Sequence, residues 1–160
     1  MTAIGKLLVA LFTVVVLIGA LCFSGLLFVI WPTTLGDQQL TISGATVEKL
    51  RQLQGEEKFR EDMTHFYPGA PDEVSRLSAQ EGVNSVVEAL VRELPRNPRR
   101  SVVLREFKRA LPAYDRFDSE ERDQVLLYFE RIMVITGVKD SGELLNVWRY
   151  GVPYGWFVEA

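Results

Sequence analysis

The N-terminal part of the chain is one long run of apolar positions. From Leu7 to Trp31 the sequence contains no charged residue. A helix of this length reaches roughly 37 Å, whereas the hydrocarbon core of a bilayer is about 30 Å thick. The run therefore predicts a transmembrane helix that contacts the lipid bilayer through Leu7 to Trp31. Residues 1–31 would form this anchor together with a short cytoplasmic start.

Other interpretations of the apolar run fit less well. A cleaved signal peptide has an apolar region of about 7–15 residues and a small-residue cleavage site, and the sequence matches neither feature. Lipidation at Cys22 would require a small residue before it, but Leu21 occupies that position. Ala20 and Ser24 are small residues four positions apart, so a weak homodimer through the anchor is a minority interpretation.

Beyond the anchor, the pattern changes to helical periodicity. Turn-forming residues over 32–43 indicate a linker, with a brief strand expected at 39–43, and residues 44–160 form a helical soluble domain. The expected helices cover about 46–54, 56–66, 71–94, 100–111, 118–136 and 140–148. Asp72 and Asp118 mark the N-terminal ends of two expected helices, and Gly137 marks the C-terminal end of the helix that begins at Asp118. The prediction is an all-α protein, in which a compact bundle of five or six short helices follows the transmembrane helix.

Charge and composition limit the classes of function and the topology. The 160-residue chain has a formal net charge of −3, and this mildly acidic balance gives no reason to expect nucleic-acid binding. Its single cysteine excludes an internal disulfide. Lys6 precedes the apolar run, and no lysine or arginine follows it until Lys49. This distribution favours a cytoplasmic N-terminus and a C-terminal domain on the opposite side of the membrane.

The stretch FDSEERDQVLLYFERIMVITGVKDSGELLNVWRYG, residues 117–151, carries a family resemblance. It resembles the C-terminal signature of a bacterial family of small helical proteins catalogued as a domain of unknown function. The residues that carry the resemblance are Phe117, Asp118, Glu120, Glu121, Arg122, Tyr128, Phe129, Glu130, Ile132, Met133, Gly137, Leu144, Leu145, Asn146, Trp148, Tyr150 and Gly151. The resemblance implies a bacterial helical domain, and it supplies no catalytic residues. The anchor would then lie in the bacterial inner membrane, with the domain in the periplasm.

The sequence contains few candidates for catalytic chemistry. His65 is the one histidine, and Glu61, four residues earlier, would share its face if residues 56–66 were helical. A histidine at a helix end, hydrogen-bonded to a nearby carboxylate, is the more ordinary interpretation. No nucleophile elbow, metalloprotease motif, phosphate loop or dinucleotide fingerprint occurs, so we predict no catalytic, metal or cofactor site.

Two groups of residues suggest binding. Arg105, Lys108 and Arg109 would share one helix face, which could meet acidic lipid headgroups or an acidic protein, although a solvated face is the favoured interpretation. The C-terminal aromatic stretch offers Arg149 and Trp156 for contacts, although such a tail also seals small cores.

The leading hypothesis from the sequence is a non-enzymatic, membrane-tethered domain that binds an envelope protein, in an accessory or immunity-type role. The alternatives are a tethered enzyme with an unfamiliar site around His65, Glu61 and Asp62, and a sensor of anionic lipid surfaces.

Overall fold

The computed structural model describes residues 3–31 and 33–151, without the side chains of residues 3, 4, 7 and 25–30. Across these residues it contains six α-helices and two short 3₁₀ turns, and no strand. The elements are α1 (Ala3–Ile30), α2 (Gly44–Gly55), η1 (Met63–His65), α3 (Glu73–Glu93), α4 (Arg100–Ala110), η2 (Leu111–Tyr114), α5 (Ser119–Thr136) and α6 (Leu144–Tyr150). The predicted all-α class and the helical bundle, formed by α2 to α6, are confirmed.

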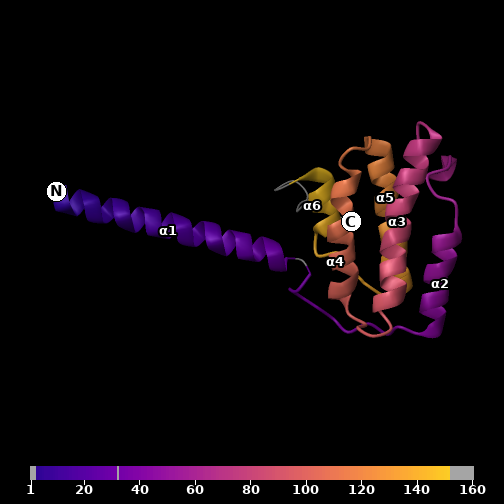
Figure 1. The fold of residues 1–160 in the computed structure, drawn as a ribbon, viewed down its shortest axis with the longest axis horizontal. Coiled ribbons are helices and arrows are strands. Elements are labelled where there is room, and N and C mark those ends of the chain that lie inside the picture. The colour runs from indigo at the N-terminus through magenta and orange to yellow at the C-terminus, as the bar shows by residue number, and fades with distance from the viewer. Residues whose placement is uncertain (1–2, 32, 152–160) are drawn as a thin grey trace.

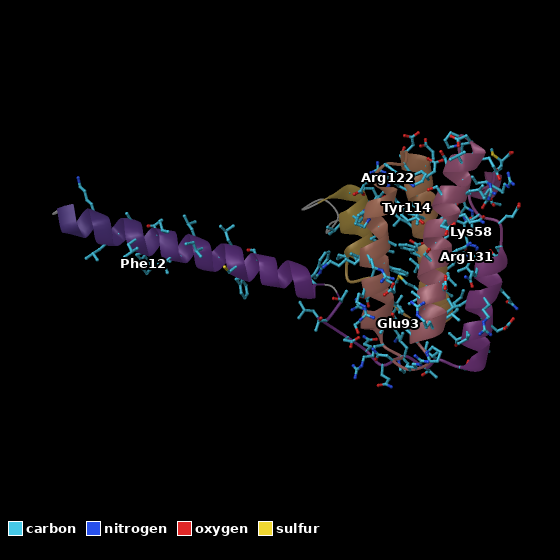
Figure 2. All side chains as sticks on the ribbon, viewed as in Figure 1. Phe12, Lys58, Glu93, Tyr114, Arg122 and Arg131 are labelled. Carbon is cyan, nitrogen blue, oxygen red and sulfur yellow. The ribbon has the colours of Figure 1, made fainter. Side chains whose placement is uncertain are left out.

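Helix α1 extends away from the bundle as a separate rod (Figure 1). Large apolar side chains along it are exposed, including Phe12 at 71% and Leu21 at 73%. Figure 2 shows Phe12 far from every helix of the bundle. Judged on the described residues, no helix is both long enough and apolar enough to cross a membrane.

The bundle is arranged around α3, which contacts α2, α4 and α5. Figure 1 shows α3 side by side with these neighbours. Its buried stripe includes Val83, Val87 and Leu90, which are fully inaccessible to solvent and follow helical spacing. The ring of Phe107 from α4 stacks on that of Phe129 from α5, with centroids 4.3 Å apart and an interplanar angle of 7°. This aromatic pair joins α4 to α5 within the core.

Several helix ends form where the sequence indicates them. Asp72 accepts a hydrogen bond from the Ser75 amide at 2.8 Å and caps α3. Gly137 ends α5 with a left-handed φ of 79°, as the glycine stop predicts. Ser43 caps α2, and Thr46 supplies the reciprocal bond of a capping box.

Three sequence predictions are corrected by the structure. Residues 56–66 form an irregular segment with the short turn η1 instead of a helix, because long-range bonds described below fix their backbone. The last helix begins at Leu144 rather than near Asp140, since Glu143 at its N-terminus has a left-handed φ of 66°. The expected strand at 39–43 is reduced to one isolated bridge between Gln39 and Arg99.

Residues 33–43, which we call the strap, run across the N-terminal end of α4. The Asp37 carboxylate accepts hydrogen bonds from the Ser101 amide at 2.8 Å and from Arg99 at 3.1 Å. Burial alone would raise the pKa of Asp37, but these bonds outweigh it and lower the pKa below its ordinary value. The Leu40 amide donates to the carbonyl of Pro98 at 2.7 Å. The strap is therefore fixed to the bundle by both backbone and side-chain hydrogen bonds.

A buried arginine and a lysine complete this junction. The Arg100 guanidinium, only 4% exposed, donates to the Leu35 carbonyl at 3.2 Å and to the Asp140 carboxylate at 2.9 Å. The Lys108 ammonium donates to the carbonyl of Trp31, directly after α1, at 2.8 Å. Helix α4 thus contacts both the strap and the end of α1.

Candidate functional site

A short loop between α2 and α3 presents apolar side chains to solvent. We call residues 62–67 the docking loop. Its ends are joined by two backbone hydrogen bonds between Asp62 and Tyr67, of 2.8 and 2.9 Å. The Asp62 carboxylate accepts further bonds from the Thr64 amide at 3.1 Å and from His65 Nδ1 at 2.8 Å. The bonds from Thr64 and then from His65 lower the pKa of Asp62. The loop is therefore a closed, internally bonded turn.

The tip of the docking loop carries Phe66, whose surface is 85% exposed. Its backbone adopts a left-handed conformation with φ of 54°, which costs a residue with a side chain about 1–2 kcal/mol. Met63, in the same loop, is 62% exposed. Strained backbone and exposed aromatic surface both oppose stability, and such features concentrate at functional sites.

The loop is attached to the bundle by Tyr67, which is only 3% exposed. Its hydroxyl donates to the buried Glu121 carboxylate of α5 at 3.2 Å. Burial, followed by the negative charge of Glu121, raises the pKa of Tyr67 well above its ordinary value. The tyrosine therefore stays protonated and continues to donate across the usual pH range.

The segment before the loop is positioned by bonds to distant helices. The Lys58 amide donates to the Gln80 side chain of α3 at 2.8 Å, and the Phe59 amide donates to the Tyr128 hydroxyl of α5 at 3.2 Å. Phe59 is also left-handed, with φ of 58°, and its buried ring lies 5.2 Å from that of Tyr128. These contacts replace the helical hydrogen bonds that the sequence predicts for residues 56–66.

Lys58 is itself fully buried, and its ammonium donates to the carbonyls of Gln54 at 3.3 Å and Glu56 at 2.9 Å. Figure 2 shows Lys58 beside Arg131 near α2. Burial lowers the pKa of Lys58 to about 8, with the charge of Glu56 opposing this shift and that of Arg131 adding to it. The lysine holds the end of α2, where the last carbonyls have no helical partner and need a donor.

The lowered pKa of Lys58 predicts how the stability of the protein depends on pH. Between about pH 8 and the ordinary lysine pKa, the unfolded chain binds a proton at Lys58 that the folded chain has released. The contribution of Lys58 to stability should therefore rise as the pH increases from about 7.5 to 9.5. Urea unfolding in neutral detergent at several pH values, carried out on the full-length protein and on its Lys58→Met variant, measures this contribution. An identical pH slope in both proteins would contradict the prediction.

A pocket of about 360 Å³ lies between the docking loop and α5. Its lining is aromatic at the loop and both acidic and aliphatic along the helix: His65, Phe66, Tyr67, Glu120, Asp123, Gln124, Leu126, Leu127 and Glu130. Partial burial raises the pKa of the Glu130 carboxyl, although the residue as a whole is exposed. The pocket can accommodate one side chain or a short segment of a partner.

His65 lines this pocket, but its partner differs from the one expected. The prediction of a helix placed Glu61 beside it, whereas the turn η1 brings Asp62 to 2.8 Å. His65 is 54% exposed, and the pocket lining includes no serine, threonine or cysteine nucleophile. Among the described residues, no group of three or more histidine, cysteine or acidic side chains could hold a metal ion.

The basic residues singled out by the sequence lie elsewhere and carry ion pairs. Arg105 contacts Glu93 of α3 at 2.7 Å, and Arg109 pairs with Glu106, which is 2% exposed. Lys108 contacts the end of α1, as described above. These three residues share α4, yet nearby carboxylates offset the charge of both arginines.

Of the two residues predicted in the C-terminal aromatic stretch, only Arg149 lies within the described residues. The guanidinium of Arg149 pairs with Asp123 through two bonds, one of them 3.1 Å long, beside the pocket. Trp156 lies outside the described residues. Phe66, Leu127 and Glu130 were not predicted as binding residues. The local sequence pattern does not distinguish an exposed phenylalanine from a core one, and it does not show that Leu127 and Glu130 face the loop.

Comparison with known proteins gives one match. The model of a family described as a domain of unknown function, DUF4844, matches residues 41–153. This range contains the whole of the signature at 117–151, and it begins within the strap. No curated protein and no solved structure matches the chain.

Proposed function

The chain belongs to the DUF4844 family, whose description names no activity, and we propose from its surface that it is a membrane-tethered protein-binding module. The observation that carries the proposal is Phe66, 85% exposed on a closed loop at the rim of a pocket. The helical domain would capture a segment of an envelope protein between the docking loop and α5. The role would be accessory or immunity-type rather than enzymatic.

The energetics of the docking loop support binding. Aromatic side chains contribute much of the binding energy at protein interfaces, and rigid ones lose little conformational entropy on association. Phe66 is held by a turn whose ends are bonded to each other and whose last residue, Tyr67, bonds to α5. A partner would therefore meet a surface that is already ordered.

Helix α1 would supply the membrane tether. The apolar run in the sequence from Leu7 to Trp31 includes Leu7 and residues 25–30, whose side chains lie outside the described set. The described side chains of α1 are apolar and exposed, and lipid would remove this area from water. With Lys6 before the helix, the domain would face the periplasm from the bacterial inner membrane.

Two alternatives have less support. An enzyme centred on His65 would use the Asp62 partner at 2.8 Å, but the pocket supplies no nucleophile to activate. A lipid sensor built on Arg105 and Arg109 would need these side chains to exchange Glu93 and Glu106 for headgroups.

Photo-crosslinking in native membranes tests the binding proposal. A photoreactive amino acid at position 63, beside Phe66, should give one dominant protein adduct. The same group at position 35, where the native leucine is 52% exposed in the strap and takes no part in lining the pocket, serves as the control and should give none.

A second substitution separates binding from folding. Phe66→Gly removes the ring and the left-handed strain, so the free energy of unfolding should stay constant or rise by about 1 kcal/mol. The adduct at position 63 should nevertheless fall at least tenfold, since hot-spot aromatics contribute more than about 1.4 kcal/mol. Adducts of equal strength at positions 63 and 35, or an adduct unaffected by Phe66→Gly, would contradict the proposal.

A further inference from the structure

We infer that the pocket beside the docking loop takes an arginine side chain from the partner segment, with its guanidinium at Glu130 and its aliphatic carbons on Leu126 and Leu127. This inference rests on the proposed binding function and adds the chemistry of the partner.

The lining of the pocket is negatively charged and incompletely neutralised. Glu120, Asp123 and Glu130 contribute carboxylates, and no lysine or arginine lines the space. Asp123 is already engaged by Arg149 from α6. Glu130, by contrast, takes part in none of the ion pairs found among the described residues. Since partial burial already disfavours its charged form, a bound cation would relieve an existing cost.

The apolar part of the pocket is placed to receive an aliphatic stem. Leu126 and Leu127 precede Glu130 by four and three residues on α5, so all three share one side of the helix. Both leucines are partly exposed and line the pocket with Phe66. Arginine buries its methylene carbons along apolar surface while its head group stays polar, and its guanidinium also stacks on aromatic faces.

Arginine fits better than lysine because of the shape of its head group. A planar guanidinium can bond a carboxylate through two parallel hydrogen bonds and can lie over the Phe66 ring at the same time. An ammonium group is a compact, strongly hydrated charge that gains less from either contact. We therefore expect arginine to be preferred, with lysine binding more weakly.

Other occupants match the pocket less well. Residues 152–160 of this chain contain no lysine or arginine and end with Glu159 before the last alanine, so their charge does not complement the lining. In a second copy of the chain, Arg105 and Arg109 already pair with carboxylates of their own bundle. The exposed Arg92 and Arg96 belong to a chain whose net charge of −3 opposes self-association. An arginine from another protein is the occupant that the charges favour.

The test uses the full-length protein in micelles of an uncharged detergent. The probe is the peptide acetyl-Ala-Arg-Leu-Ala-Arg-Leu-amide, and the matched peptide replaces both arginines with citrulline, which keeps the shape and removes the charge. Amide chemical shifts in NMR locate the peptide, and their titration gives the dissociation constant. The variant is Glu130→Gln, and the control is Glu88→Gln, which removes an equal charge from an exposed position on α3.

We expect shifts concentrated at Phe66, Leu126 and Leu127 with the arginine peptide. Glu130→Gln and the citrulline peptide should each weaken binding roughly fivefold or more, whereas Glu88→Gln should leave it within about twofold. Equal weakening by both glutamine variants, equal binding of both peptides, or shifts elsewhere on the bundle would overturn the inference. Adducts at position 63 that survive Glu130→Gln would also overturn it, while leaving the binding function itself supported.

Discussion

Replacing Phe129 with alanine should lower the free energy of unfolding by about 3–5 kcal/mol. The ring is fully buried, stacks on Phe107 at 4.3 Å and meets the edge of Tyr114 at 6.5 Å. Its removal leaves a cavity at the contact between α4 and α5, which the neighbouring rings cannot fill without breaking their own packing. Urea unfolding of the full-length protein in neutral detergent, followed by circular dichroism, measures the change.

The matched control is Phe66→Ala, which removes the same side chain from an 85% exposed position. It should change stability by no more than about 0.5 kcal/mol, because little packing is lost at the surface. Comparable losses for the two variants would mean that the docking loop is part of the core. That result would count against both the core described here and the binding role of the loop.

Replacing Gly82 with alanine should destabilise the protein by about 2 kcal/mol, even though alanine favours helices by about 1 kcal/mol over glycine. A Cβ at this position of α3 would lie 2.3 Å from the Tyr114 hydroxyl oxygen and 2.9 Å from the adjacent ring carbon. The tyrosine cannot retreat easily, because it is only 1% exposed and its hydroxyl donates to the Ala79 carbonyl at 2.8 Å.

A double-mutant cycle identifies the cause of that loss. Tyr114→Phe removes the nearest clashing atom, so the double variant should lose less stability than the sum of the two single variants. The expected coupling is about 1 kcal/mol, measured by the same urea titrations. Strict additivity would indicate that Gly82 is required for a reason other than its approach to Tyr114.

The helices of the bundle could largely be predicted from the sequence, because their signals are local. Asp72 and Gly137 act within one turn of the helix ends that they mark. The segment at 56–66 could not be predicted in this way. Its conformation depends on the Gln80 and Tyr128 side chains, which are 22 and 69 residues away from their partners Lys58 and Phe59. Helical periodicity carries no information about such bonds.

The candidate site was missed for the same reason. The basic residues at 105–109 form a conspicuous cluster in the sequence, but Glu93 and Glu106 reach Arg105 and Arg109 in the folded chain. The pocket combines residues from the docking loop with residues from α5, more than fifty positions later. Phe66 becomes conspicuous only when its exposure and its positive φ are known.

The strap has a consequence for how a partner would be found. A domain on a flexible linker explores many orientations, but Asp37 and Arg100 fix residues 33–43 to the bundle, and Lys108 holds the end of α1. In Figure 1, α2 and the chain leading from it to α3 lie on the side of the bundle away from α1. With α1 embedded in a membrane, the docking loop would stay at a nearly constant distance from the membrane surface while the protein diffuses laterally. Encounter would then become a two-dimensional search, efficient for partners that share the membrane or reach that layer.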